Sequence, residues 1–492
     1  MITKPKALTL FILLIISFLV NINAIKAQVS IDSIKKIIQN EVAGKRCKSI
    51  IVGIVNMKGK QVFAEGVKSD ADPSLPDGNT IYEIGSITKV FTSLVLSKMS
   101  LRHELNLNDP ISKYLPTDVK SPSKNGKEIS LLNLSTHRSG MPRFPYNVDP
   151  KNLDQAYQDY TVKELYQYLS TFKPPYEIDS RWRYSNVGYG ILGNILSVIE
   201  KKDFETLIKD EITIPLRLNN TLITLSKKQK ANLAIGHAET GTPVGLTELG
   251  AIAPGGALRS SVDDLLEFAA ANLALKQTDL LPAMELTHKL QAKKDGDNTY
   301  TTMGWTLVDS TGNVLFKDGG MPGYTTFIGI DKKNKIGVVV LSNSNNTVTD
   351  IGRYILEPGR KINTYQYSWS LLDTLRSTYK NKGIDATLSL YEKLKANKDS
   401  KLIFNENQLN YLGNELRTNK KIKEAITIYQ FNLKEYPNSL LALESLGETY
   451  RRSGELQNAR SCFEKALSLE PQNEHWTFIL GKLNSKKINK NI

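Results

Sequence analysis

Strand patterns lie near both ends of residues 28–365 of this 492-residue chain, and helical patterns fill the stretch between them. Two early runs of strand-forming residues, 50–57 and 60–67, are joined by a tight Lys-Gly turn. Strand patterns return late, at 304–309, 313–317, 325–331 and 336–342. The two sets of strands are expected to pair in one antiparallel sheet, because helices and loops occupy the residues between them. This predicts an α+β fold with a separate helical lobe.

The C-terminal part, residues 366–492, repeats with a period of 34 residues. Five positions of the first repeat have equivalents 34 residues later in the second. Leu412, Gly413, Ala425, Tyr429 and Pro437 correspond to Leu446, Gly447, Ala459, Phe463 and Pro471. This pattern resembles the tetratricopeptide repeat, which implies pairs of antiparallel helices. Clear repeats cover 406–439 and 440–473, and an earlier helix pair is expected over about 367–396. Two clear repeats are few for a free-standing solenoid, so the tail is expected to pack against the earlier helix pair or the first domain. Structural packing and docking of a protein or peptide partner both remain open as its role.

The first residues have the composition of a secretory signal. Lys4 and Lys6 precede an apolar run at 7–20 that is too short to span a bilayer comfortably. Small residues follow and end at Ala27, which predicts that residues 1–27 are a cleaved signal peptide. A bacterial protein with this signal is expected in the periplasm or outside the cell. The alternative is an uncleaved anchor, which would be the only contact with a membrane.

Bulk composition excludes several classes of function. The formal net charge is +14, but no basic stripe is interleaved with aromatic residues, so nucleic acid is not an expected partner. The only two cysteines, Cys47 and Cys462, fall in different predicted domains, which favours free thiols over a disulfide. Since no cluster of His, Cys and carboxylate residues has metal-ligand spacing, neither a metal nor another cofactor is expected.

The stretch Ser86-Ile-Thr-Lys89 places a hydroxyl and an amine three residues apart, at the start of an apolar run with helical spacing. Residues three apart on a helix share a face, so the two groups can touch. A nucleophilic serine needs a base within reach, and the start of a helix adds a favourable field. The alternative is a capping serine followed by a solvated lysine. The same spacing occurs at Ser33/Lys36, Ser121/Lys124, Ser170/Lys173 and Ser377/Lys380.

Two later motifs complete a pattern with this one. Tyr184-Ser-Asn186 follows Ser86, and Lys317-Asp-Gly319 comes later still. In this order the three motifs resemble those of the serine β-lactamase and penicillin-binding-protein superfamily, and the Tyr-Ser-Asn form is most similar to the class C β-lactamase branch. The stretches 105–116 and 134–142 also match family signatures. The resemblance spans roughly residues 30 to 360 and implies an antiparallel sheet flanked by helices, with a helical lobe.

The resemblance implies a catalytic role for three of these residues. Ser86 would attack a carbonyl and form an acyl-enzyme, and Lys89, desolvated by burial, would accept the serine proton. Tyr184 would be the second proton carrier, with flanking cations lowering the pKa of its phenol.

The remaining motif residues would bind substrate or support the site. Asn186 would contact Lys89 and the substrate amide, and Lys317 and Gly319 would lie on the substrate side. The backbone N–H groups of Ser86 and Gly320 would form the oxyanion hole.

Three other residues bear on this assignment. Lys294-Asp-Gly repeats the letters of the third motif, but Lys294 is expected to be solvated in a strandless loop, whereas Lys317 ends a strand pattern before a Gly-rich turn. His137 is expected to brace the loop around Thr136 and Ser139 rather than to act in catalysis. Asp318 stands where relatives often have Thr, which would disfavour acidic substrates if its side chain points inward.

The sequence therefore predicts an exported serine hydrolase that acts on an amide or ester through an acyl-enzyme. Cell-wall peptides with D-amino-acid ends, as cleaved by D-Ala-D-Ala carboxypeptidases, are the leading substrate class. A β-lactam hydrolase or a promiscuous esterase is the alternative among enzymes, so the small-molecule partner is a peptide, a β-lactam or an ester. The alternative of another class is a non-catalytic penicillin-binding-like sensor or scaffold.

Overall fold

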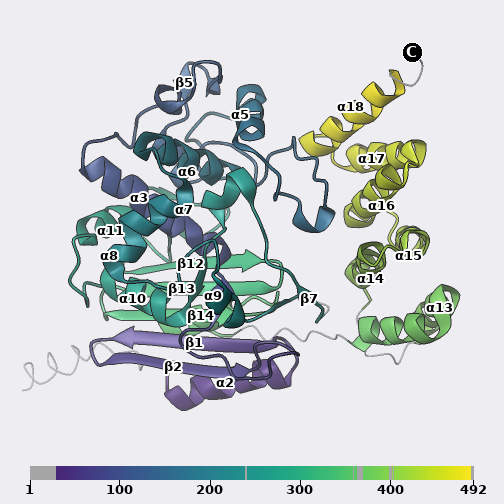
Figure 1. Ribbon diagram of the computed structural model, residues 1–492, viewed down its shortest axis with the longest axis horizontal. Coiled ribbons are helices and arrows are strands. Elements are labelled where there is room, and N and C mark those ends of the chain that lie inside the picture. The colour runs from purple at the N-terminus through teal and green to yellow at the C-terminus, as the bar shows by residue number, and fades with distance from the viewer. Residues whose placement is uncertain are drawn as a thin grey trace, which may run out of the picture.

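The architecture is seen in a computed structural model (Figure 1). The residues that it describes are 29–238, 241–357, 359–362, 370–397, 402 and 404–488. The expected signal segment, 1–27, lies outside the described residues, as does the start of the expected helix pair at 367–369. Within the described segments, none of the helices combines the length and apolar character that a bilayer crossing requires.

An antiparallel sheet of eight strands forms the centre of the first domain (Figure 1). Its order is β2-β1-β14-β13-β12-β11-β10-β9. The early hairpin pairs with the last strand, so Ile50 lies opposite Ser342, and the predicted sharing of one sheet by early and late strands is confirmed. The bounds are β1 (Ser49–Asn56), β2 (Gly59–Gly66), β9 (Ala292–Lys293), β10 (Tyr300–Thr301), β11 (Thr306–Leu307), β12 (Val314–Met321), β13 (Tyr324–Asp331) and β14 (Ile336–Ser342).

Two strands differ from the sequence-based prediction by more than one residue at a boundary. The pattern at 304–309 yields only the two residues of β11. The pattern at 313–317 continues as β12 to Met321, with Gly319 paired to Thr326 and Gly320 to Thr325. Lys317 therefore lies within a strand, not at its end, because the glycines that suggested a turn are part of the sheet.

Helices cover both faces of the sheet. The helices α2 (Ile31–Ala43) and α12 (Thr349–Leu356) pack on one face, where their apolar side chains join those of β1, β13 and β14. The other face is covered by α10 (Val262–Asn272), which contacts β1 and β14. The α3 helix (Thr88–Leu101) lies behind the sheet in the larger core cluster. The nearly continuous burial of β1 follows, because both faces of the strand are covered.

A helical lobe and small hairpins complete the first domain. The longest helix of the lobe is α6 (Asn186–Glu200), which packs against α4 and the 3₁₀ segment Gly250–Gly255. The other helices are α4 (Leu131–Ser135), α5 (Val162–Thr171), α7 (Phe204–Ile208), α8 (Ile214–Leu216), α9 (Lys227–Ala231) and α11 (Leu281–Thr287). The strand pairs are β3 (Ile81–Glu83) with β8 (Arg259–Ser261), β4 (Ser123–Lys124) with β5 (Lys127–Glu128), and β6 (Gly236–His237) with β7 (Pro243–Val244).

The repeat tail forms a separate column of helices with its own core (Figure 1). Glycines recur where helices approach closely: a Cβ on Gly413 would lie 2.4 Å from the ring of Tyr429, and one on Gly447 would lie 3.0 Å from Phe463. The predicted helix pairs are confirmed, and a further helix follows the second repeat. The bounds are α13 (Ser370–Ala396), interrupted by non-helical Gly383, α14 (Glu406–Thr418), α15 (Ile422–Glu435), α16 (Leu440–Ser453), α17 (Leu456–Leu469) and α18 (Glu474–Ile488).

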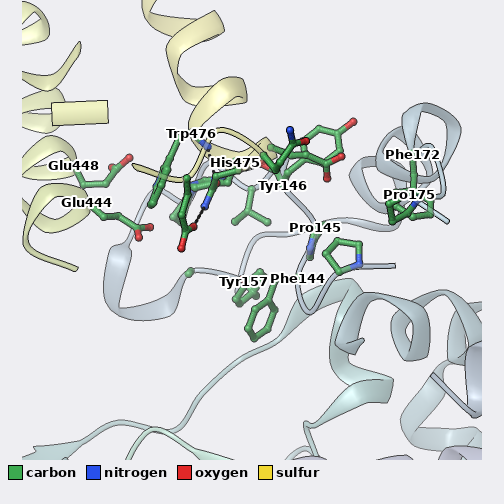
Figure 2. Close-up of a pocket in the computed structure, with 18 of the residues that line it drawn as sticks. Phe144, Pro145, Tyr146, Tyr157, Phe172, Pro175, Glu444, Glu448, His475 and Trp476 are labelled. Atoms are coloured by element: carbon green, nitrogen blue, oxygen red, sulfur yellow. Dashed lines mark hydrogen bonds between the residues drawn. The ribbon is translucent and has the colours of Figure 1, made fainter. Parts of the chain in front are cut away.

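One loop of the first domain, residues 142–157, contacts the repeat tail. The Asp149 carboxylate accepts hydrogen bonds from Arg451 at 2.8 Å and from Lys482 at 2.6 Å. At the other end of the contact, the backbone oxygen of Tyr146 lies 2.9 Å from the His475 imidazole Nδ1 (Figure 2). The tail is thus docked against the first domain, and α14 also contacts α13, so both of the arrangements that we expected from the low repeat number occur.

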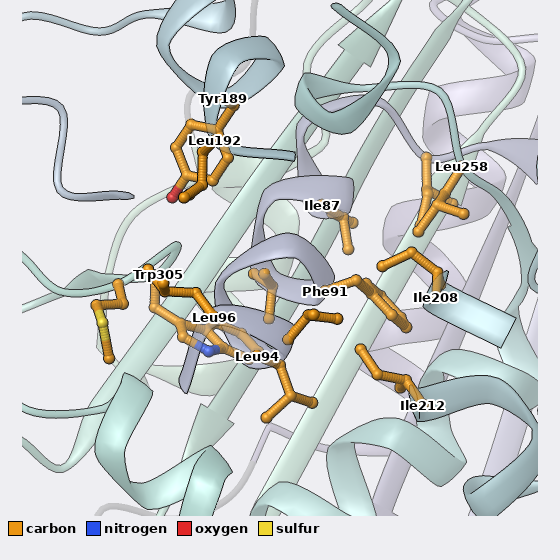
Figure 3. Packing of buried hydrophobic residues seen from close by; sticks show 14 of the residues in the cluster. Ile87, Phe91, Leu94, Leu96, Tyr189, Leu192, Ile208, Ile212, Leu258 and Trp305 are labelled. Atoms are coloured by element: carbon orange, nitrogen blue, oxygen red, sulfur yellow. The ribbon is translucent and has the colours of Figure 1, made fainter. Parts of the chain in front are cut away.

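The core behind the sheet surrounds the helix that follows Ser86 (Figure 3). Phe91 stacks on Phe268 with ring centroids 4.4 Å apart, and Leu94 and Trp305 lie nearby in the same cluster. These side chains are almost completely buried, so α3 has apolar neighbours on nearly every side. The segment that carries the Ser-x-x-Lys motif is therefore held rigidly. Cys47 and Cys462 are both buried and free.

Candidate active site

Ser86 lies on a tight turn that leads directly into α3. The turn is one short 3₁₀ segment, Gly85–Ile87, and the α-helix proper begins at Thr88. Gly85 has a φ of +51°, and a Cβ there would lie 2.8 Å from the backbone N of Gly320. A glycine is required at this position because both the backbone conformation and the space exclude a side chain.

The strand β12 runs against this turn. A Cβ on Gly319 would lie 2.1 Å from the carbonyl oxygen of Ile84, whereas one on Gly320 would meet no atom within 4 Å. The Thr326 hydroxyl donates to the same Ile84 oxygen at 3.0 Å and ties β13 to the turn. The backbone N of Gly320 is thus brought beside the residue preceding Ser86, and its Cα faces open space. Gly319 has no side chain, which allows β12 to lie this close to the turn before Ser86.

Lys89 is fully buried one helical turn after Ser86. Its Nζ donates to Ser86 Oγ at 3.1 Å, to Asn186 Oδ1 at 2.7 Å and to the carbonyl oxygen of Gly255. Burial lowers the pKa of this amine to about 8, and the nearby cations Lys317 and Arg143 contribute to the lowering. Lys89 can therefore lose its proton near neutral pH and act as a base toward the Ser86 hydroxyl.

Tyr184 reaches the same hydroxyl from the segment before α6. Its phenol oxygen forms a hydrogen bond with Ser86 Oγ. The Nζ atoms of Lys89 and Lys317 lie 4.9 and 5.1 Å from the centre of its ring. Burial raises the pKa of this phenol, but Lys89 and Lys317 outweigh that effect and lower the pKa to about 8. Either Tyr184 or Lys89 can thus exchange a proton with Ser86.

His137 holds the segment that carries Tyr184. Its Nδ1 accepts a hydrogen bond from the backbone N–H of Ser185 at 3.1 Å, and its carbonyl oxygen accepts one from Arg183 N–H at 2.8 Å. Burial lowers the pKa of the imidazole well below its usual range, with further lowering by Lys317 and Lys89. His137 is neutral and braces residues 183–185, a different segment from the 136–139 loop that the sequence suggested.

A cavity of about 490 Å³ opens in front of Ser86. Ser86, Tyr184, Lys317, Gly319 and Gly320 all line it, so the structure brings these predicted residues to one pocket. Lys89 and Asn186 lie behind this surface, where Lys89 contacts Ser86 and Asn186 contacts Lys89.

Lys294 also lines this pocket, and the expectation that it would be solvated in a loop is wrong. It follows β9, and its Nζ donates to Thr306 Oγ1 at 2.9 Å and lies 4.9 Å from the centre of the Trp182 ring. Burial lowers the pKa of this amine to about 8, aided by the charge of Lys317. The sheet edge formed by β9–β11 carries it into the site, and that edge has too few residues for a visible strand pattern.

Arg143 and Trp182 also line the pocket, and the sequence reasoning missed both. The guanidinium of Arg143 lies 5.6 Å from the centre of the Tyr184 ring. Trp182 precedes Tyr184 by two residues, and residues two apart in an extended segment face the same side. That alternation is the signal that could have placed Trp182 in the pocket.

The pocket is strongly positive. Its lining includes the cations Arg143, Lys294 and Lys317 and one carboxylate, Asp318. The charge of Asp318 partly opposes the lowering of the Lys294 pKa. Asp318 does line the pocket and would disfavour an acidic substrate, but three cations outnumber it, so the pocket as a whole favours a substrate that carries a carboxylate. Among the described residues, no group of three or more His, Cys, Asp and Glu side chains could hold a metal ion.

The pocket thus holds an activated serine with two candidate proton carriers and an adjacent backbone N–H. A model of the β-lactamase family matches residues 34–357 of the chain. The chain belongs to the β-lactamase family. A model of the tetratricopeptide repeat matches residues 441–473, within the tail. This β-lactamase family member is a serine hydrolase with a tetratricopeptide-repeat tail, as its sequence indicated.

Curated relatives of this family member include enzymes of two kinds. The chain is 28% identical over 288 residues to the D-alanyl-D-alanine-carboxypeptidase/endopeptidase AmpH of Escherichia coli K12, which covers 54% of the chain and 71% of the relative. It is 26% identical over 326 residues to a β-lactamase of Lysobacter lactamgenus, covering 60% of the chain and 82% of the relative.

Solved structures show the same fold. The β-lactamase/D-alanine carboxypeptidase of Pseudomonas syringae superposes with a TM-score of 0.59 at 21% identity, covering 67% of this chain and 99% of that one. The octameric penicillin-binding protein homologue of Pyrococcus abyssi gives a TM-score of 0.60 at 23% identity, covering 67% and 77%. The β-lactamase/transpeptidase fold predicted from the motifs is thereby confirmed.

Proposed function

We propose that this serine hydrolase is an exported D-Ala-D-Ala carboxypeptidase-like enzyme that cleaves cell-wall peptides ending in D-amino acids. The observation that carries the proposal is the positive pocket in front of Ser86, formed by Arg143, Lys294 and Lys317. A peptide cleaved at its last bond brings its terminal carboxylate within reach of these cations. The relative named as a carboxypeptidase supports the same substrate class.

The reaction that we assign to the site runs through an ester on Ser86. The hydroxyl loses its proton to the Lys89–Tyr184 pair as its oxygen attacks the scissile carbonyl. The backbone N–H groups of Ser86 and Gly320 would hold the developing oxyanion. Tyr184 then delivers the proton to the leaving amine as the carbon–nitrogen bond breaks, and Asn186 keeps Lys89 in place.

Deacylation follows the same path with water as the nucleophile. Tyr184 accepts the proton of the attacking water, and the proton returns to Ser86 Oγ as the ester bond breaks. The products are the shortened peptide and the free D-amino acid, and the enzyme regains its starting state. The near-equal pKa values of Lys89 and Tyr184, both about 8, support proton exchange in both directions.

Hydrolysis of β-lactams is the second candidate, favoured by the relatives named as β-lactamases. The same nucleophile would open the lactam ring, and the two candidates differ in how fast the acyl-enzyme reacts with water. A non-catalytic sensor is disfavoured because the catalytic positions, Ser86, Lys89 and Tyr184, all hold groups able to take part in acyl transfer.

The test compares turnover of a peptide ending in D-Ala-D-Ala with its L-Ala-L-Ala counterpart, a penicillin and a simple ester. The expected result is release of the terminal alanine from the first peptide but not from the second, and slower turnover of penicillin. Mass spectrometry should find penicillin bound to Ser86 in the natural enzyme and no adduct in Ser86→Ala. Release of D-Ala by Ser86→Ala at the natural rate would remove this residue from the mechanism. Faster turnover of penicillin than of the peptide would favour the second candidate.

Residues 1–27 have the composition of a secretory signal, and this supports the proposal of export. Cell fractionation of a bacterium expressing the full chain should find the shortened protein outside the cytoplasm. Deleting residues 2–27 should leave the protein in the cytoplasm, and equal distribution of both forms would argue against a signal.

A further inference from the structure

A second, larger cavity of about 970 Å³ lies between the catalytic domain and the repeat tail (Figure 2). One side is the loop 142–157, and the other is formed by α16 and the turn between α17 and α18. We refer to it as the interdomain cavity. Its size falls within the range of about 300–1,000 Å³ that small-molecule and peptide sites occupy.

The catalytic-domain wall of the interdomain cavity is mainly aromatic and proline-rich, and it carries two cations, Lys173 and Arg183. The ring of Phe144 stacks on that of Tyr157 with centroids 4.9 Å apart. Tyr146 packs edge-on against Phe478 of the tail at 6.3 Å, and Trp476 closes the tail side (Figure 2). A rigid aromatic lining of this kind offers apolar contact to a ligand at low entropic cost.

The tail wall is acidic. Glu444, Glu448, Glu470 and Glu474 all line the cavity. Arg451 pairs with Glu448, but among the described residues neither Glu444 nor Glu470 has a lysine or arginine within ion-pair distance. Burial raises the pKa of Glu444, and the charges of Glu448 and Glu470 raise it further, against an opposing effect of His475. The carboxylates repel one another and would be stabilised by a cation between them.

The interdomain cavity and the active-site pocket share one thin wall. Its two segments, 142–144 and 182–186, are joined by hydrogen bonds from Asn186 N to Arg143 O at 2.9 Å and from Ser185 Oγ to Pro142 O at 2.8 Å.

Side chains alternate across this wall. The residues that line the active-site pocket are Arg143, Trp182 and Tyr184. The residues that line the interdomain cavity are Pro142, Phe144 and Arg183. A ligand that shifts this shared backbone from one side would also move Tyr184 and Arg143 on the other.

We propose that the interdomain cavity binds a short peptide carrying side-chain amines, and that its occupancy is transmitted to Tyr184 and Arg143 through the shared wall. The amines would lie against Glu444 and Glu470, and the apolar part of the ligand against Phe144, Tyr146 and Trp476. The positive active-site pocket disfavours the same ligand, so the two sites select opposite charges. This proposal concerns a separate site, and its binding test does not depend on which substrate the enzyme cleaves.

The binding test uses the full-length protein and two blocked tripeptides, acetyl-Lys-Phe-Lys-amide and acetyl-Glu-Phe-Glu-amide, measured by calorimetry. The lysine peptide should bind, and the double variant Glu444→Gln/Glu470→Gln should bind it at least tenfold more weakly. The matched control, Glu464→Gln on the exposed face of α17, should bind it as the natural protein does. Equal or tighter binding of the glutamate peptide, or unchanged binding by the double variant, would overturn the proposal.

The coupling test follows amide hydrogen exchange, a readout that is independent of activity. The amide of Asn186 donates a hydrogen bond to Arg143 O across the wall, and the amides of Arg183 and Ser185 donate to His137, so together they report the state of the segment that carries Tyr184. Saturating lysine peptide should change their exchange rates several-fold in the natural protein and not in the double variant. Binding that leaves these rates unchanged would refute transmission through the wall.

Discussion

Replacing Lys317 with methionine removes a cation from beside Tyr184 and keeps an unbranched side chain of similar length. The charge lies 5.1 Å from the ring centre of Tyr184 and lowers the pKa of both Tyr184 and Lys89. At that separation the Coulomb energy is about 3 kcal/mol for an effective dielectric constant of about 20, and about 0.8 kcal/mol in water. Because a tenfold change in a protonation equilibrium corresponds to about 1.4 kcal/mol, the pKa of Tyr184 should rise by about 1 to 2 in Lys317→Met, and the pKa of Lys89 should rise as well.

The assay is the pH dependence of kcat/KM with a neutral ester, which avoids any loss of contact between Lys317 and a substrate carboxylate. In the natural enzyme the rate should rise with pH and level off above about 8, as the Lys89–Tyr184 pair loses a proton. In Lys317→Met the rising limb should move to higher pH. At pH 7, which is below both pKa values, the rate should therefore be about tenfold lower if the limb moves by about one pH unit.

The matched control is Lys228→Met, which removes an exposed cation on α9, far along the chain from the pocket residues. Its profile should coincide with that of the natural enzyme. A limb that stays in place in Lys317→Met, or moves to lower pH, would refute the assignment of Lys317 as the cation that tunes the proton carriers. A rate reduced equally at all pH values would point to a structural defect instead.

Four further changes test other parts of the site and the fold. Tyr184→Phe should lower kcat for the ester by about 10²-fold or more with little change in KM, and an unaltered kcat would reassign the proton carrier. Gly319→Ala should abolish turnover and lower the melting temperature, because its Cβ would lie 2.1 Å from the Ile84 oxygen; full activity would show that the strand can shift. Phe91→Ala should cost about 3–5 kcal/mol in urea unfolding, and a loss below about 1 kcal/mol would contradict the packing around α3. Deleting residues 370–492 should leave ester turnover within about threefold, since the two domains have separate cores; loss of activity in a folded truncation would mean that the tail completes the site.

Much of the fold was predictable because its signals are local. Strand patterns, turn residues and the 34-residue period each depend on neighbouring positions, and they placed β1, β2, β13, β14 and the tail helices correctly. The end of β12 was missed because Asp318-Gly319-Gly320 has the composition of a turn. The glycines are needed there for a different reason, which is the close approach of the strand to the turn before Ser86. That requirement comes from tertiary contact and leaves no periodic signal.

The site was predictable only where motifs named its members. Ser86, Tyr184 and Lys317 lie on separate segments, and nothing in their spacing shows that they meet; the family resemblance supplied that information. Lys294 was misjudged because its flanking strands are two residues each, below the length at which alternation can be recognised. The interdomain cavity could not be foreseen, since its two walls come from domains with unrelated patterns.

The pairing of Ile50 with Ser342 has a consequence for how the polypeptide matures. The first hairpin leaves the ribosome long before its neighbour β14 exists, so one edge of β1 must wait unpaired while the whole helical lobe is made. Exposed strand edges invite association with other chains, and distant contacts slow folding. The repeat tail joins mostly successive helices and can form as soon as it emerges. Newly made chains should therefore contain an ordered tail beside a first domain that is still closing its sheet, and that period is when aggregation is most to be expected.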